Sequence, residues 1–270
     1  MSVAGWSIDL PFAYVAVMAG LWLWGGRGGM RARRWRAAAF WGGLGAIVIA
    51  LDSPIDHEAD KLLWVHMVQH LLLLTVAPPL LLLARPGPRL LRALPANAGR
   101  SLARGLARSR SAAPLRALAR PLPSWLAFTG TLAVWHLPAL YDATLRSGAV
   151  HDLEHITFYA TALLFWAHAL AVPPLRTMLD WPRRAAYVAG AMVAGWVLAL
   201  VFALARHPLY AAYAHLAHRP GGLSAMADQQ LAAGMMWVPG SISFTIAFIV
   251  ALYRWLEPQR ERAAASAMTT

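Results

Sequence analysis

Two stretches of this chain each contain a pair of histidines four residues apart: WVHMVQHLLLLTVAPPLLLLA at residues 64–84 and VHDLEHITFYATALLFWAHAL at residues 150–170. The pairs are His66 with His70 and His151 with His155. On an α-helix this spacing places both imidazoles on one face, with Cβ atoms about 6 Å apart. Each pair lies at the start of a long apolar run. An ionisable side chain in a membrane-length helix indicates a functional site. The spacing therefore predicts two imidazole pairs, each able to share a metal ion.

The composition is typical of an integral membrane protein. Apolar residues make up 59% of the 270 residues and charged residues 13%, whereas an average soluble domain carries about 25% charged residues. The apolar runs predict an all-α polytopic membrane protein, a single domain built as a bundle of seven transmembrane helices. The predicted spans are residues 10–24, 37–51, 62–84, 125–140, 150–172, 185–205 and 229–256. The N-terminus lacks the basic segment that opens a cleaved signal peptide, so we expect the first span to be retained.

The formal net charge of +12 reports the orientation of these spans and does not indicate a nucleic-acid partner. Arginine-rich segments follow the first, third, fifth and seventh spans, whereas the segments at the other ends of the spans are poor in arginine. Cytoplasmic loops carry the excess of Lys and Arg, so we expect the N-terminus outside and the C-terminus in the cytoplasm of a bacterial plasma membrane. Residues 85–120 then form an Arg-rich cytoplasmic loop, either an amphipathic helix on the lipid surface or a disordered basic linker.

This topology brings the histidine pairs to one depth of the membrane. The third and fifth spans both run inward, so both pairs lie near the outer face, and the fourth span carries another histidine near its outer end. Neutral imidazole binds copper, zinc, iron and nickel, and the chain has no cysteine that could supply a thiolate. We therefore predict a metal site in the outer leaflet whose candidate ligands are His66, His70, His136, His151 and His155.

A further set of residues near this layer is predicted to support the site. A side chain that accepts a hydrogen bond from a ligating imidazole fixes its tautomer, and Glu154, Asp228 and Gln229 stand at the right depth to do so or to control access. Thioether sulfur is a soft ligand that selects Cu(I), so the expected metal is copper, although zinc and iron suit the same imidazoles. The methionines of the predicted transfer path are Met67, Met235 and Met236.

One motif suggests an enzyme instead. Residues 151–155 read His-Asp-Leu-Glu-His, which matches the H-x-x-E-H pattern of one class of zinc proteases. In such a site the two histidines bind Zn²⁺ and the glutamate acts as general base. The parallel stretch at residues 66–70 has Gln69 where that base would stand. An intramembrane metallohydrolase is therefore the alternative to a metal-binding protein that is not an enzyme.

Several of these stretches resemble the caa3-type cytochrome c oxidase assembly factor family (CtaG, Bacillus type). The resemblance is carried by SPID at residues 53–56, WVHMVQHLLL at 64–73, APPLL at 77–81, WHLPALYDATL at 135–145, VHDLEHITF at 150–158 and DQQLAAGMMWVPG at 228–240. It implies a seven-span membrane protein needed to mature haem–copper oxidases at the copper-loading stage. The implied partners are the oxidase subunit that carries the CuB site, membrane lipids and a periplasmic copper chaperone. A metal-free scaffold for oxidase assembly is the rival implication.

Overall fold

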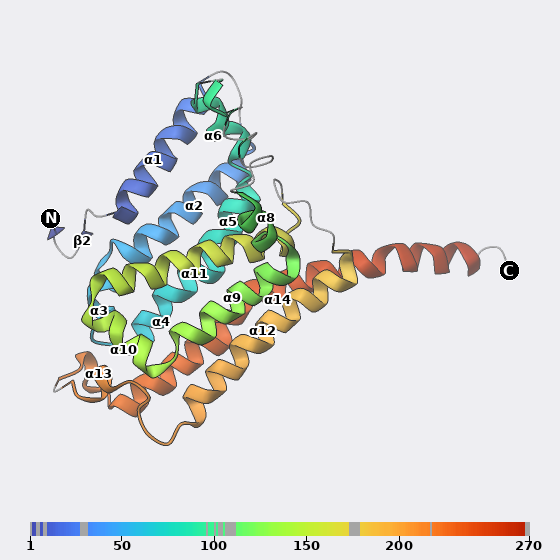
Figure 1. Ribbon diagram of the computed structural model, residues 1–270. Coiled ribbons are helices and arrows are strands. Elements are labelled where there is room, and N and C mark those ends of the chain that lie inside the picture. Colours follow the sequence, from blue (N-terminus) through green and yellow to red (C-terminus); the bar gives the residue numbers. More distant parts are fainter. Residues whose placement is uncertain are drawn as a thin grey trace.

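The computed structural model describes residues 2–3, 6–7, 10–27, 32–95, 97–99, 101, 105, 112–172, 179–216 and 218–267. Within these ranges the regular structure is helical, apart from an antiparallel pair of two-residue strands, β1 (Ser2–Val3) and β2 (Trp6–Ser7). The all-α fold predicted from the apolar runs is confirmed for the body of the molecule. Figure 1 shows the long helices side by side, with α1 at one edge of the bundle.

The long helices follow the apolar runs of the sequence, and short helices join them. The long ones are α1 (Leu10–Gly25), α2 (Arg34–Leu51), α4 (Leu63–Leu71), which continues through the π-helical turn η1 (Leu72–Val76) into α5 (Ala77–Ala84), α9 (Pro121–Trp135), α11 (Gly148–Ala169), α12 (Trp181–Leu204) and α14 (Ala225–Ala267). The short ones are α3 (Pro54–Ala59), α6 (Gly87–Ala93), α8 (Ala113–Leu118), α10 (Pro138–Arg146), α13 (Ala211–Ala214) and the 3₁₀ turn η3 (Pro220–Gly222).

Three of the described helical segments are long and apolar enough to cross a membrane, namely Leu63–Ala84, Trp181–Leu204 and Ala225–Glu257, and α1 is a shorter apolar helix. The outward faces of α12 and α14 carry exposed apolar side chains such as Val197 and Ile246. Soluble proteins rarely expose large continuous apolar surfaces, whereas several imidazoles and carboxylates of this molecule, such as His66 and Glu154, are buried. This distribution suits a lipid environment.

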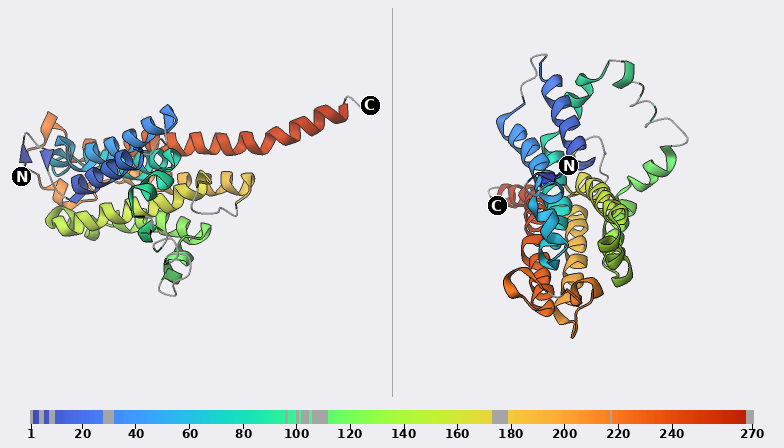
Figure 2. Two further views of the ribbon diagram at one scale, coloured as in Figure 1. Left: turned by 90° about the horizontal axis from the view of Figure 1, so that it is seen from above. Right: turned by 90° about the vertical axis from the view of Figure 1, so that its left-hand side faces the viewer.

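The largest differences between the observed helix ends and the predicted ends of the apolar runs are at α9 and α14. α9 ends at Trp135 and not at residue 140, because Pro138 has no N–H and holds Leu137 extended, with φ −67° and ψ 131°. α14 continues past residue 256 to Ala267, and its C-terminal part projects beyond the bundle (Figure 2). Its last turns are rich in alanine, the strongest helix former, so the helix outlasts the apolar run.

The Arg-rich loop at residues 85–120 contains α6 and α8, and most of residues 96–111 lies outside the described part of the chain. The two interpretations of this loop, a surface helix and a disordered linker, therefore both stay predictions.

The π-helical turn η1 lies between the second histidine of α4 and a double proline at the start of α5. Pro78 and Pro79 have no N–H, so the carbonyls of Leu74 and Thr75, four residues earlier, lose their helical partners. Both carbonyls are paired from other helices: the Trp166 Nε1–H of α11 donates to Leu74 O at 2.7 Å, and the Ser243 hydroxyl of α14 donates to Thr75 O at 2.6 Å. Side chains of two neighbouring helices thus complete the backbone hydrogen bonding of this one.

The start of α4 is also held by another helix. The carboxylate of Asp228, in the first turn of α14, accepts hydrogen bonds from the backbone N–H groups of Leu63 at 2.9 Å and Trp64 at 3.0 Å. The first N–H groups of a helix have no partner within the helix, and the N-terminal end of the helix dipole favours a negative charge. Asp228 therefore caps α4 and fixes the helix end that precedes His66.

Replacing Trp166 by phenylalanine removes the N–H that pairs with the Leu74 carbonyl and keeps an aromatic ring in the core. We expect the free energy of unfolding to fall by about 1–3 kcal/mol, because a buried carbonyl is left unpaired. Denaturant unfolding in detergent measures the change. Trp237→Phe is the matched control, since Trp237 is 38% exposed, and equal stability of the two variants would contradict the assignment.

Replacing Asp228 by alanine removes the cap of α4. We expect a loss of about 0.5–2 kcal/mol in the free energy of unfolding, the range measured for caps supplied by side chains. The control is Gln230→Ala, two residues further along α14, where the side chain is exposed. If thermal denaturation showed no difference between these two variants, the capping role would be wrong.

Candidate metal centre

The candidate centre lies where α4 and α11 face each other. Each helix contributes two side chains to a group of four, His66 and His70 from α4 and Glu154 and His155 from α11. Each of them offers one ligand atom, and these atoms all lie within 4.8 Å of one another. The four side chains are buried, with relative exposures between 0% and 5%. The two histidine pairs quoted from the sequence therefore meet, and three of their four imidazoles belong to this group.

The Glu154 carboxylate lies between the two imidazoles of α4. Its Oε2 is 3.6 Å from His66 Nε2, and its Oε1 is 3.5 Å from His70 Nε2. These separations exceed the 2.7–2.9 Å typical of a charge-assisted hydrogen bond. Ligand atoms about 2.0–2.1 Å from a tetrahedral ion lie roughly 3.3–3.4 Å apart, which is close to the observed distances. These two separations therefore fit donor atoms around a metal ion better than direct hydrogen bonds, and the four ligand atoms as a whole lie within 4.8 Å of one another.

The hydrogen bonds of two imidazoles identify their tautomers. Tyr213 donates its hydroxyl hydrogen to the Ala59 carbonyl at 2.5 Å and lies 3.2 Å from His66 Nδ1. His66 Nδ1 must then be the donor to the tyrosine oxygen, which leaves a lone pair on the Nε2 that faces Glu154. His136 likewise donates from Nδ1 to the Leu132 carbonyl at 2.7 Å. In both rings the nitrogen that would bind a metal is Nε2.

The buried nitrogen and oxygen atoms without hydrogen-bond partners are further evidence for a metal site. Among the described residues, Nε2 of all five predicted histidines and both Glu154 oxygens are buried without a hydrogen-bond partner. Buried polar atoms are almost always paired, and leaving them unpaired is costly. In the His66 tautomer described above, Nε2 is an acceptor, like the carboxylate oxygen of Glu154 that it faces, so a positive charge between the two atoms would make their approach favourable. The donor set therefore fits a cation.

His136 and His151 lie beside the group of four. The His136 ring centroid is 5.7 Å from that of His70, and the His151 centroid is 4.1 Å from that of His155 and 5.1 Å from that of His66. A single ion held by the group of four leaves these two imidazoles as neighbours. The five histidines that the sequence predicts as candidate ligands therefore approach one another closely.

The Glu154 carboxylate lies among the ring nitrogens of the group. This place makes it a candidate ligand in addition to the hydrogen-bond acceptor that the sequence predicts. The other two polar residues contact the backbone. Asp228 caps α4, and Gln229 accepts from the Leu209 N–H at 2.8 Å and donates to the Phe202 carbonyl at 3.1 Å. Both side chains therefore fix backbone segments around the centre.

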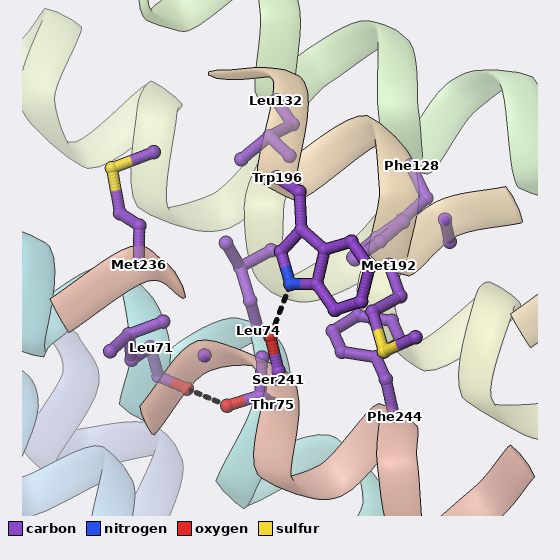
Figure 3. A pocket seen from close by; sticks show the side chains of 13 residues that line it. Leu71, Leu74, Thr75, Phe128, Leu132, Met192, Trp196, Met236, Ser241 and Phe244 are labelled. Carbon is purple, nitrogen blue, oxygen red and sulfur yellow. Dashed lines mark hydrogen bonds between the residues drawn. The ribbon is translucent and has the colours of Figure 1, made fainter. Parts of the chain in front are cut away.

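The three methionines occupy packing positions. Met67 is buried in an apolar cluster that includes Phe202 and Tyr210. Met236 lines a cavity of about 50 Å³ between α4, α9, α12 and α14, opposite Trp196 (Figure 3), and Met235 is half-buried on the same helix. The soft-ligand argument for Cu(I) therefore has less weight than the imidazole and carboxylate donors.

Sequence reasoning missed two residues that support the centre. Tyr213 fixes the His66 tautomer from 147 positions away, and Gln69 donates from Nε2 to the Ala50 carbonyl and to Asp56 Oδ1, both at 2.8 Å. Gln69 thereby ties α4 to α2 and α3, which explains the glutamine between the two histidines of α4. No spacing pattern in the sequence predicts either contact, because both join segments that only the fold brings together.

Comparisons with known proteins agree with the resemblance seen in the sequence. Uncharacterized proteins of Mycobacterium bovis and Mycobacterium tuberculosis are each 22% identical over 231 residues, which is 83% of this chain and 34% of theirs. An uncharacterized protein of Mycobacterium leprae is 24% identical over 267 residues, 93% of this chain and 39% of its own. The chain thus spans little more than a third of the length of these relatives, and no solved structure matches it. The model of the cytochrome c oxidase caa3 assembly factor family (Caa3_CtaG) matches residues 13–258, and the chain belongs to that family.

Proposed function

We propose that this protein binds copper in the buried group of His66, His70, Glu154 and His155 and hands it to the CuB site of a cytochrome c oxidase during assembly. The observation that carries the proposal is this group itself, four buried side chains whose ligand atoms lie within 4.8 Å of one another. Membership in an oxidase assembly factor family supplies the biological context. The oxidase subunit that carries CuB is then the partner, with membrane lipids around the bundle and a periplasmic copper chaperone as donor.

The donor chemistry supports copper. Three imidazoles and one carboxylate form a nitrogen and oxygen set that suits divalent first-row metals, and in such sets affinity peaks at Cu²⁺ in the Irving–Williams order. When bound, the ion would supply the positive charge that the acceptors around Glu154 require. Neighbouring residues orient the ligands of this buried group. Tyr213 sets the tautomer of His66, and Asp228 and Gln69 fix the helix that carries His66. Zinc and iron would compete for the same donors.

We further propose that the bundle crosses the bacterial plasma membrane seven times, with the N-terminus outside. The alternation of Arg-rich and Arg-poor segments supports this orientation, and the apolar helices support the membrane location. The metal group lies in the first turns of α4 and α11, which this orientation puts near the outer face. Copper arriving from outside the cell would then reach it without crossing the membrane.

The position of Glu154 argues against the metallohydrolase alternative. A general base must be free to take a proton from water, but both oxygens of this carboxylate lie within 3.6 Å of imidazoles on α4. The assembly-factor family also suggests a role without catalysis. Glu154→Gln separates the two functions. In a hydrolase the metal would stay bound and activity would be lost, whereas we expect the metal itself to be lost.

Metal analysis of protein purified without chelators tests the copper proposal. We expect about one copper ion per chain, as for a four-coordinate site, and less than a tenth of that in the double variant His66→Ala with His70→Ala. The matched control removes two exposed histidines instead, as His57→Ala with His207→Ala, and is expected to keep its copper. Purified protein without copper, zinc or iron above background would contradict the proposal.

Glu154→Gln keeps the size of the side chain and removes its charge. We expect the copper dissociation constant to rise by more than the 10–100-fold typical of residues that only support a ligand. Competition with a chromophoric copper chelator measures it. A metal-free scaffold makes the opposite prediction: both this variant and the double histidine variant would still support full assembly of an active oxidase in cells.

A further inference from the structure

A pocket of about 600 Å³ opens on the side of the bundle between α1, α2 and α11. This volume falls within the range of about 300–1,000 Å³ that is typical of ligand sites. Most of its lining is apolar and comes from the first turns of α1, the end of α2 and the outward face of α11, for example Val17, Leu51 and Ile156. The pocket therefore lies at the same end of the bundle as the metal group.

Four lining residues carry a carboxyl or imidazole group and could receive a hydrophilic ligand: Asp56, Asp152, His151 and His155. Only His155 is both part of the buried group of four and a lining residue of this pocket. His66, His70 and Glu154 are 0–2% exposed and do not line it. Among the described residues, His155 is thus the direct link between the pocket and the metal group.

His151 also lines the pocket and lies beside His155. It is half-buried, and its Nε2 is enclosed without a hydrogen-bond partner among the described residues. Its ring centroid is 4.1 Å from that of His155 and 5.1 Å from that of His66. This imidazole therefore lies between the pocket that it lines and the buried ligands.

The charge of the pocket suits a cation. The side chains of Asp152, which is exposed, and Asp56, which is half-buried, bring two carboxylates into an otherwise apolar wall. Carboxylates in a cleft with low-dielectric walls raise the local concentration of positive ions. Asp56 is also held in place, because Gln69 donates to its Oδ1 at 2.8 Å.

We infer that this pocket is the port through which the metal ion reaches the buried group, with His151 as its first protein ligand. The ion passes from His151 to His155 and the buried group by exchange of one neutral imidazole ligand for another, so no electron or proton is transferred. This inference rests on the proposed metal binding and adds its route. His151 is accordingly a transfer ligand and not a permanent one.

The absence of cysteine in the chain allows a direct test of the route. Ala160→Cys places a single thiol in the lining of the pocket. One sample is capped with a small methylthio group and a second with a bulky maleimide, so that neither has a free thiol to bind copper. The time course of copper uptake is then measured by stopped flow with a chromophoric copper donor. We expect uptake at least tenfold slower with the bulky cap and the same final copper content.

Two further samples complete the experiment. Ala186→Cys, on an exposed position of α12 outside the pocket, carries the same two caps and is expected to show equal rates. His151→Ala is expected to take up copper more slowly and to reach the full copper content. Equal rates for the two caps at residue 160, or a lower final copper content in His151→Ala, would overturn the inference and leave the metal site itself intact. Absence of copper from the unaltered protein would overturn the site and its route together.

Discussion

The burial of one carboxylate among imidazoles is the constraint on which the rest of the structure depends. Glu154 has no exposed surface, and its two oxygens face ring nitrogens of His66 and His70. Removing an ionised carboxylate from water costs several kcal/mol unless an opposite charge compensates it. The approach of the α4 imidazoles to this carboxylate of α11 therefore favours a positive charge at this point. The proposed metal ion would contact ligands from both helices, and its binding would then also stabilise the fold.

The geometry of the two α4 histidines is set by contacts at the ends of their helical segment. Asp228 of α14 caps the N-terminal end, and Trp166 of α11 and Ser243 of α14 pair with the carbonyls that the double proline releases beyond the C-terminal end. The histidines lie between these two anchor points on a segment that can neither slide nor rotate freely. Preorganised ligands of this kind lose little conformational freedom when an ion binds.

Much of the fold and part of the site could be predicted from the sequence, since both depend on periodicity. Apolar runs predicted the long helices, and the spacing of four residues predicted which histidines share a face. The meeting of the two pairs depends on the packing of α11 against η1 and α5, which continue α4. The end of α9 was missed, although Pro138 signals it locally. The place of Glu154 and the role of Tyr213 depend on how helices turn toward one another, and no local pattern encodes that rotation.

The hydrogen bonds at the double proline also bear on how the protein is made. The chain is synthesised from its N-terminus, so the segment with Pro78 and Pro79 leaves the ribosome long before the donors at Trp166 and Ser243 exist. Exposed carbonyls in hydrocarbon are costly, and this segment cannot reach its final state in lipid alone. The hydrogen bonding of its backbone is complete only when α14 is in place. The final positions of the α4 histidines therefore depend on contacts from parts of the chain that are made much later.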